Sequence, residues 1–217
     1  MLRAGRDPAQ ASFGLVLLHG RGAGARDILG FAEALALPDL AFIAPEAKGL
    51  SWWPTSFLAP TMQMAPYVDA GLSQVASAVE TFKHAGLAPA QIGVLGFSQG
   101  GCLALEYLAR EGEGIGFGVA LSAGLVGTGD IDGTSEPTLY DHQDKMFDYQ
   151  GDLSGLTLYA SCHTSDPHIP LKRFEDSVGV MAGLGASVDH RIKPGQGHGI
   201  DTEDVARVRQ LFNVSLG

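Results

Sequence analysis

The chain has 217 residues, which is long enough for a single domain, residues 1–217, with a hydrophobic core of its own. Hydrophobic residues make up 45% of the sequence and charged residues 18%, a composition that is typical of globular proteins and excludes a largely disordered chain. The net charge of −10 argues against nucleic acid or an anionic membrane surface as a partner, because phosphate binding needs clustered lysine and arginine.

Short apolar runs alternate along the chain with segments of helical periodicity. The apolar runs predict strands at 13–18, 40–44, 92–95, 117–121, 156–160 and 187–192. The periodic segments predict helices at 27–37, 68–85, 102–109, 169–182 and 202–212. Strands that alternate with helices and are mostly apolar form parallel sheets with helices on both faces, so the expected fold class is α/β.

Two segments show no regular pattern. Residues 45–66 contain four prolines and the pair Trp52-Trp53, and we expect them to be irregular. Residues 124–155 are rich in glycine, aspartate and threonine and include a patch from Tyr140 to Tyr149. A segment of this length without regular structure predicts a surface loop or a lid over a functional site.

The sequence predicts neither an export signal nor a membrane span. The N-terminal residues include basic side chains but no apolar region behind them, so they do not resemble a signal peptide. No apolar run approaches the ~20 residues that a membrane-spanning helix needs. The expected compartment is the cytoplasm, where Cys102 and Cys162 would be reduced and buried, although a single disulfide between them stays compatible with the sequence.

The strongest motif is Gly96-Phe97-Ser98-Gln99-Gly100, which matches the pattern of a nucleophile elbow. In this turn a strand passes abruptly into a helix, and glycines flank the serine because larger side chains would clash. In a chain with 30 glycines the bare pattern arises by chance in about one sequence in four. Here an apolar strand precedes the motif and an apolar helix follows it. Ser98 is therefore the candidate nucleophile, rather than an idle serine in a glycine-rich turn.

A serine hydroxyl needs a base to remove its proton, and histidine is the usual base because its pKa lies near neutrality. An acid and then a histidine are expected after the serine in chain order. His198 fits, because it lies in a glycine-rich loop directly after the last predicted strand. His190 would point from within a strand, and His142 sits in an irregular region. His163 and His168 bracket the candidate acid and are interpreted as its neighbours.

Asp166 is the candidate acid. It follows the predicted strand 156–160, so it is expected at the same edge of the sheet as Ser98 and His198. A carboxylate there would accept a hydrogen bond from the histidine ring and fix its tautomer. Asp189 lies within a strand. Asp201 lies at a helix start, and a helix N-cap is also the alternative role of Asp166 itself.

Acyl transfer puts negative charge on a carbonyl oxygen in the transition state, so backbone N–H groups must already point at that oxygen. One donor is expected from Gln99, the residue after the nucleophile. The other is expected from Arg21, in the glycine-rich turn after the first predicted strand. His19, at the end of that strand, is expected to brace the turn.

Four motifs occur in order between residues 13 and 212. They are His19-Gly20-Arg21-Gly22, Gly96-Phe97-Ser98-Gln99-Gly100-Gly101, Asp166-Pro167-His168-Ile169-Pro170 and Gly197-His198. Together they resemble the phospholipase/carboxylesterase family of small α/β-hydrolases, which includes acyl-protein thioesterases and bacterial carboxylesterases. The resemblance implies an α/β-hydrolase fold without a large cap domain and an esterase that needs no metal. It also implies that Trp52 and Trp53 line the substrate pocket, with core packing as their alternative role.

Three features depart from the family pattern. Arg21 stands where the eukaryotic thioesterases usually carry leucine, so the chain looks closer to the bacterial carboxylesterases. His168 stands where a small apolar residue is usual, so we expect it to bind substrate at a more polar pocket rim. Only about a dozen residues precede the first predicted strand, so the antiparallel edge hairpin of larger relatives is expected to be missing or shortened.

The expected function is hydrolysis of small or medium carboxylic esters through an acyl-enzyme on Ser98. A thioesterase or lysophospholipase is the alternative within the same chemistry, and it would need a long apolar groove, for which Phe57, Leu58, Met62 and Met64 are candidates. An amidase or peptidase would share the same three residues. A non-catalytic binding protein on the same fold is the alternative from another class.

No cofactor is expected, and the partner is a small-molecule ester. Cys162, His163, Asp166 and His168 lie close together in sequence, but their spacing matches no structural zinc pattern, so no metal site is predicted. The sequence leaves open whether the protein forms a homodimer.

Overall fold

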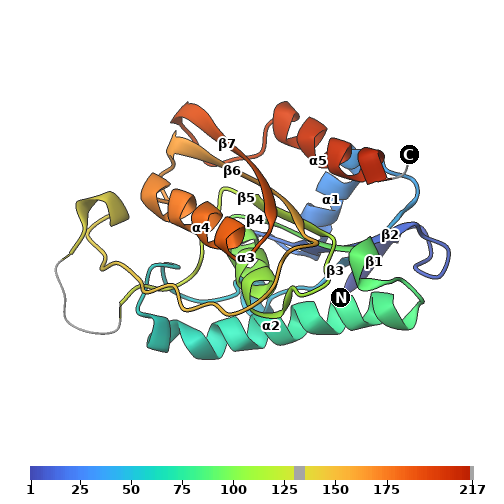
Figure 1. Cartoon of the computed structure of the whole chain (residues 1–217), viewed down its shortest axis with the longest axis horizontal. Coiled ribbons are helices and arrows are strands. Elements are labelled where there is room, and N and C mark those ends of the chain that lie inside the picture. The colour runs from blue at the N-terminus through green and yellow to red at the C-terminus, as the bar shows by residue number, and fades with distance from the viewer. Residues whose placement is uncertain (130–134, 216–217) are drawn as a thin grey trace.

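The computed structural model describes residues 1–129 and 135–215, with side chains as far as Phe212. A seven-stranded sheet lies at its centre, and helices cover both faces (Figure 1). The strands are β1 (Leu2–Gly5), β2 (Phe13–Leu18), β3 (Leu40–Ala44), β4 (Ile92–Phe97), β5 (Phe117–Leu121), β6 (Thr157–Ser165) and β7 (Ser187–Gln196). The helices are α1 (Ala25–Leu35), α2 (Thr61–His84), α3 (Gln99–Glu111), α4 (Leu171–Gly183) and α5 (Thr202–Ser215).

The strand order in the sheet is β1-β3-β2-β4-β5-β6-β7. All neighbouring pairs are parallel except β1 and β3, which are antiparallel. From β2 the chain first moves outward to β3 and then returns to β4 on the other side of β2. The connection after β2 and the connection after β4 therefore run to opposite sides. This leaves a crevice beyond the carboxyl ends of β2 and β4, where α/β proteins bind ligands.

Two hydrophobic cores lie on the two faces of the sheet. Under α1 and α5, sheet residues such as Leu15 and Phe117 pack against Ile28 and Phe212. Under α2, α3 and α4, the other face of the sheet forms a larger core with residues such as Leu103. Both faces of the central strands are buried, which explains their continuous apolar sequences.

One strand was missed by the sequence analysis. Residues Leu2–Gly5 form an edge strand whose four residues are all exposed, so no apolar pattern marks it. The strand pairs with β3, with Leu2 opposite Ala44 and Gly5 opposite Ala41. The edge hairpin of larger relatives was expected to be missing or shortened, and in the described residues a single short antiparallel strand occupies this edge.

The prediction that residues 45–66 are wholly irregular was wrong, because α2 begins at Thr61 and contains Pro66. Met64, Val68 and Leu72 are buried at a spacing of four residues, so one continuous face of this helix packs on the core despite the proline. The first turn is also attached to the loop after β5, because the hydroxyl of Thr61 donates to the carbonyl of Thr128 at 2.8 Å.

Strands β6 and β7 extend further than the apolar pattern indicated. They stay paired as far as Ser165 and Gln196, with an irregularity between His163 and Ser165. Most residues in these extensions are polar and the last residues of both strands are exposed, so no apolar pattern marks them. The loops after β6 and β7 therefore begin side by side, beyond the carboxyl end of the shorter strand β4.

Gly14 of β2 provides a test of the packing between the sheet and α2. A Cβ at this position would lie 2.6 Å from the fully buried ring of Phe82. We expect Gly14→Ala to lower the free energy of unfolding by about 1–3 kcal/mol, as overpacking does. Gly179→Ala on α4 is the control, because nothing lies within 4 Å of its new Cβ, and alanine should stabilise that helix by up to about 1 kcal/mol. Urea unfolding would compare them, and equal midpoints would contradict this packing.

Candidate active site

Ser98 lies in a sharp turn between β4 and α3, at the carboxyl edge of the sheet. Its backbone has φ 54° and ψ −121°, a conformation that non-glycine residues adopt only where the surroundings impose it. The N–H of Ser98 donates to the carbonyl of Leu121, and the carbonyl of Ser98 accepts from the N–H of Cys102, both at 2.9 Å. The neighbouring strand and helix therefore hold the serine in this strained conformation.

Three glycines make the turn possible by allowing close approach of backbones. A Cβ on Gly96 would lie 2.1 Å from the carbonyl oxygen of Gly100, and a Cβ on Gly100 would lie 2.2 Å from that of Leu18. A Cβ on Gly101 would lie 2.7 Å from the side chain of Ala123. None of the three has a positive φ, so lack of space rather than backbone conformation requires glycine here.

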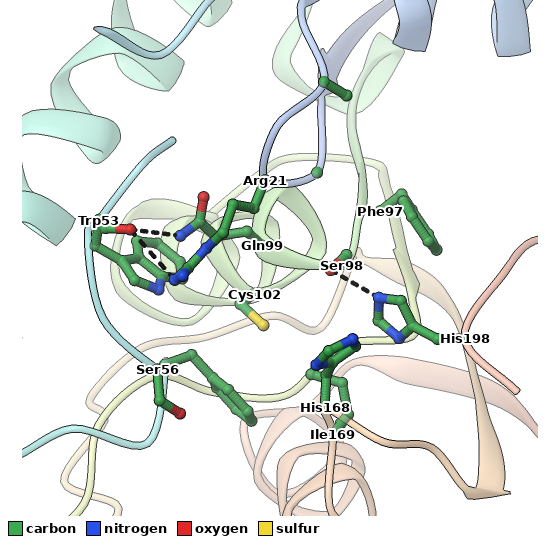
Figure 2. Close-up of a pocket in the computed structure, with 13 residues that line it drawn as sticks. Arg21, Trp53, Ser56, Phe97, Ser98, Gln99, Cys102, His168, Ile169 and His198 are labelled. Carbon is green, nitrogen blue, oxygen red and sulfur yellow. Dashed lines mark hydrogen bonds between the residues drawn. The ribbon is translucent and has the colours of Figure 1, made fainter. Parts of the chain in front are cut away.

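The structure brings together the three residues predicted as nucleophile, base and acid. The Nε2 atom of His198 lies 2.8 Å from Oγ of Ser98 (Figure 2). The Nδ1 atom of the same ring lies 2.8 Å and 2.9 Å from the two carboxylate oxygens of Asp166. In the tautomer that satisfies these contacts, Nδ1–H donates to Asp166 and the bare Nε2 accepts from the Ser98 hydroxyl.

Asp166 is buried and held in place by its own loop. Its Oδ1 accepts from the backbone N–H groups of His168 at 2.9 Å and Ile169 at 3.1 Å. The hydroxyl of Tyr140 donates to the Asp166 carbonyl, which fixes the backbone as well. Burial raises the pKa of Asp166, but the hydrogen bonds from His198 and the two N–H groups outweigh it, so its pKa lies below the ordinary value. The carboxylate is therefore ionised at neutral pH.

The loop that carries His198 is fixed to the end of β6. The hydroxyl of Thr164 donates to the carbonyl of Gly195 at 3.1 Å and accepts from its N–H at 2.9 Å. The ring of His163 packs against Gly197, where a Cβ would lie only 2.6 Å from it. Glycine next to the base is thus required by the neighbouring ring, a reason that the sequence alone did not reveal.

A buried ion pair supports the other end of the same loop. Lys193 is 2% exposed and donates to the carbonyl of Gly199, directly after His198, at 2.6 Å. Its ammonium group also lies 2.9 Å from Asp204 of α5, whose carboxylate accepts from the hydroxyl of Tyr159 at 2.8 Å. The sequence does not indicate this pair, because a lysine in a polar strand and an aspartate near a helix start resemble surface residues.

The turn after β2 lies beside the nucleophile. A Cβ on Gly20 would lie 3.4 Å from the Cβ of Ser98, which shows how close the two segments come. His19 braces this turn as expected: its buried ring donates from Nδ1 to the carbonyl of Gly20 at 2.8 Å and accepts at Nε2 from Ala47 N–H at 3.1 Å.

The two backbone N–H groups predicted as oxyanion donors belong to the turn after β2 and to the start of α3. Gln99 is the first residue of α3, and Arg21 follows Gly20. Both residues line the same cavity as Ser98. Within the described ranges, neither N–H donates a hydrogen bond to the protein, so both remain available to a ligand.

The side chain of Gln99 attaches the loop before α2 to the nucleophile turn. Its amide nitrogen donates to the carbonyl of Trp53 at 2.9 Å (Figure 2), and its amide oxygen accepts from the N–H of Trp52 at 2.8 Å. The guanidinium of Arg21 donates to the carbonyls of Trp53 and Thr55. Both residues predicted as oxyanion donors thus also position this loop through their side chains, which the sequence did not indicate.

A cavity of about 530 Å³ opens in front of Ser98 and His198. Trp53 and His168, two of the three predicted substrate-binding residues, line it, and the ring of His168 meets that of His198 edge-on at 4.8 Å between centroids. Trp52 does not line this cavity. Its ring stacks on His19 at 5.1 Å and its Nε1–H donates to the His19 carbonyl at 2.9 Å, so it packs beneath the turn instead.

Other residues of the cavity wall were not predicted as site residues. They include Ser56, Phe97, Cys102 and Ile169, while Phe57 was a candidate only for the apolar groove of the alternative function. Two of them could have been found from spacing, because Cys102 lies one helical turn after Ser98 and Ile169 lies within the motif that begins at Asp166. The wall is therefore mostly apolar, with polar groups at defined positions, as in most small-molecule sites.

A model of the phospholipase/carboxylesterase family matches residues 2–216. The chain belongs to the phospholipase/carboxylesterase family. A crystal structure of a phospholipase/carboxylesterase from Dyadobacter fermentans is similar, with 31% identity and a TM-score of 0.83 over 96% of this chain and 93% of that chain. A carboxylesterase from Mesorhizobium loti has the same fold, with 22% identity and a TM-score of 0.68 over 95% of this chain and 91% of that chain. No curated protein matches the sequence.

Membership of the phospholipase/carboxylesterase family confirms the resemblance and the α/β-hydrolase fold that were inferred from the motifs. It assigns the chain to the ester hydrolases. No helix within the described ranges is long and apolar enough to cross a membrane. Within those ranges no group of three or more histidine, cysteine, aspartate or glutamate residues could hold a metal ion.

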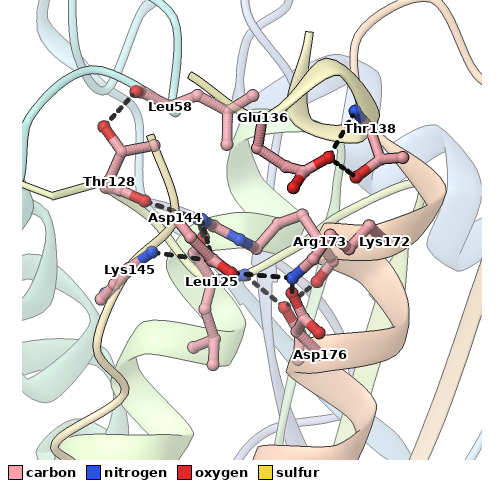
Figure 3. A network of polar contacts seen from close by, with 12 residues as sticks. Leu58, Leu125, Thr128, Glu136, Thr138, Asp144, Lys145, Lys172, Arg173 and Asp176 are labelled. Atoms are coloured by element: carbon pink, nitrogen blue, oxygen red, sulfur yellow. Dashed lines mark hydrogen bonds and ion pairs between the residues drawn. The ribbon is translucent and has the colours of Figure 1, made fainter. Parts of the chain in front are cut away.

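In this family member the segment predicted as a loop or lid, 124–155, is anchored by buried charges where it is described (Figure 3). The guanidinium of Arg173 on α4 donates to the carbonyls of Leu125 and Gly127. The carboxylate of Glu106 on α3 accepts from the N–H of Val126 and the hydroxyl of Tyr149, both at 2.7 Å. Residues 130–134 lie outside the described residues, and the described part of the segment does not line the cavity.

The ion pair beneath the His198 loop should contribute strongly to stability. Lys193→Met should lower the free energy of unfolding by about 3 kcal/mol, because Asp204 then keeps a buried charge whose remaining cation, Arg191, is half-buried and 3.7 Å away. Arg207→Met is the matched control, since Arg207 pairs with Asp189 at 3.1 Å on the surface, and such pairs contribute at most about 1 kcal/mol. Urea unfolding would compare the two variants. Equal destabilisation would show that the buried pair adds nothing beyond a surface contact.

The two cysteines are free and buried, and their thiols should be unreactive in the folded protein. Burial raises the pKa of Cys102 to about 12 and also raises that of Cys162, so the thiolate is scarce at neutral pH. Ellman's reagent should therefore detect no thiol in the native protein at pH 8 and two after unfolding in guanidinium. Rapid modification of Cys102 in the native state, located by peptide mass spectrometry, would mean that the cavity wall opens to solvent there.

Proposed function

We propose that this protein is a carboxylesterase that hydrolyses small to medium carboxylic esters through an acyl-enzyme on Ser98. The observation that carries the proposal is the continuous hydrogen-bonded chain from Asp166 through His198 to Ser98 at the wall of the cavity. A serine next to a base that is itself oriented by a carboxylate is the arrangement that activates a hydroxyl for attack on a carbonyl carbon.

In the proposed reaction, Nε2 of His198 takes the hydroxyl proton as Ser98 Oγ bonds to the ester carbonyl carbon. The resulting oxyanion accepts hydrogen bonds from the N–H groups of Arg21 and Gln99, and each such donor typically contributes about 10²–10³ in rate. The imidazolium, stabilised by the ionised Asp166, then gives its proton to the departing alcohol oxygen. Water attacks the acyl-enzyme by the same route, which releases the acid and restores Ser98.

The preference for small or medium acyl groups rests on the shape of the apolar wall. A long-chain thioesterase or lysophospholipase would need a continuous groove along 57–67. Of the four candidates for that groove only Phe57 lines the cavity, while Leu58 and Met64 are buried in the core and Met62 is 75% exposed. A cavity of about 530 Å³ without such a groove suits a short acyl chain better than a long one.

A series of p-nitrophenyl esters from acetate to palmitate tests this proposal. Wild type should show its highest kcat/KM at short to medium chains and a burst of p-nitrophenol equal to the enzyme concentration if deacylation is slow. Ser98→Ala should lose about 10⁶ in kcat and Asp166→Asn about 10⁴, by analogy with other serine hydrolases. Mass spectrometry of the stalled reaction should place one acyl group on Ser98.

The outcomes separate the alternatives. A maximum at palmitate would favour a thioesterase or lysophospholipase. Activity that survives Ser98→Ala would refute the proposed nucleophile. Arg26→Gln serves as a control, since this arginine is exposed and lies outside the cavity, and it should leave the chain-length profile unchanged.

A further inference from the structure

One wall of the cavity presents hydrogen-bond donors. The Nη2 group of Arg21 is held by the carbonyls of Trp53 and Thr55, which fixes the position of the guanidinium. Arginine has five N–H donors, and its Nε and Nη1 groups donate to nothing else in the described part of the chain. Arg21 lines the cavity, so these N–H groups are available to a bound molecule.

Two neighbouring residues add donors to the same wall. Trp53 is 1% exposed, and its indole N–H is buried without a hydrogen-bond partner among the described residues. A buried N–H left unpaired is costly, and Trp53 lines this cavity, so an acceptor bound against the indole nitrogen would remove that cost. The hydroxyl of Ser56 also lines the cavity, and its oxygen already accepts from the N–H of Leu58 at 3.2 Å, which leaves its hydrogen to donate.

The cavity contains positive but no negative charge on its lining. None of the described residues that line it is an aspartate or glutamate, and Asp166 lies behind His198 with its oxygens occupied. The chain as a whole carries a net charge of −10, so a basic wall here does not follow from the overall composition. Fixed donors around a cation, without a carboxylate nearby, are suited to an anion.

The position of His198 indicates which part of an ester faces this wall. The departing alcohol oxygen must receive its proton from Nε2 of His198, so the alcohol lies on the His198 side of Ser98. Arg21 and Trp53 lie on the opposite side of Ser98 (Figure 2). An acyl group in this orientation would extend towards the guanidinium, in a cavity that Phe57 and Cys102 also line.

We propose that the acyl group of the substrate carries a carboxylate, which Arg21 binds through its free N–H groups together with Trp53 and Ser56. The substrate class is then a half-ester of a short dicarboxylic acid. This inference rests on the proposed esterase function. The ester C–O bond breaks as Ser98 Oγ bonds to the acyl carbon, and water then releases the dicarboxylate, so the distal carboxylate is unchanged and no further reactant is needed.

The test compares two esters of matched shape, mono-p-nitrophenyl glutarate and p-nitrophenyl 5-methylhexanoate, in which an isopropyl group replaces the carboxylate. After the spontaneous rate is subtracted, wild type should have a kcat/KM at least tenfold higher for the glutarate. Arg21→Gln should lower the ratio of the two values about tenfold to a hundredfold, the usual effect of losing a hydrogen bond to a charge. Arg21→Lys should retain part of it.

The ratio is the readout because the backbone of Arg21 is also a proposed oxyanion donor, and any disturbance of its turn lowers both rates together. Arg26→Gln should leave the ratio unchanged. Calorimetry with glutarate and the Ser98→Ala variant supplies a second measurement that needs no turnover, and binding should be lost in Ser98→Ala/Arg21→Gln.

The results distinguish the inference from the function on which it rests. If the neutral ester is hydrolysed at least as well as the glutarate, or if Arg21→Gln leaves the ratio unchanged, the anionic substrate class is refuted and the esterase proposal stands. If neither ester is hydrolysed but glutarate binds in an Arg21-dependent manner, the carboxylate site is supported and the esterase proposal fails. The absence of both turnover and binding would overturn both.

Discussion

The structure of the site depends on the imidazole ring of His198, which forms hydrogen bonds to two residues at once. His198 must reach Ser98 with one nitrogen and Asp166 with the other, and these three residues follow three different strands, β4, β6 and β7. Parallel strands place their carboxyl ends at one edge, but β6 and β7 lie two and three places from β4 in the sheet. Their paired extension to Ser165 and Gln196 gives the two loops the reach that they need to meet Ser98.

Such a long reach requires stiff loops, and buried charges provide the stiffness on both sides of the site. Lys193 and Asp204 fix the loop that ends β7, and Arg173 and Glu106 fix the loop after β5. In each case a charged side chain satisfies backbone groups of an irregular segment, which could not otherwise be buried without large cost. The protein therefore uses buried charged side chains to hold these loops in place.

The amount that the sequence could reveal differed between these parts. Central strands are buried on both faces, so their apolar runs were visible, and the family motifs lie directly at their ends. The edge strand Leu2–Gly5 is exposed throughout and the extensions of β6 and β7 are mostly polar, so no apolar pattern distinguishes them from loops. Trp52 and Trp53 are adjacent and identical in type, yet only Trp53 lines the cavity, because the direction of a side chain in an irregular loop depends on contacts distant in sequence.

The contacts that hold the loop around Trp53 link substrate recognition to catalysis. Gln99 and Arg21 hold the loop around Trp53 with their side chains and are the proposed oxyanion donors through their backbones. An acyl group bound against Trp53 and Arg21 would therefore contact Arg21 directly and Gln99 through Trp53, and these are the two proposed oxyanion donors. Binding energy from the acyl group can then lower the activation barrier of the reaction as well as strengthen substrate binding. On this argument, shortening or neutralising the acyl group should lower kcat as well as raise KM.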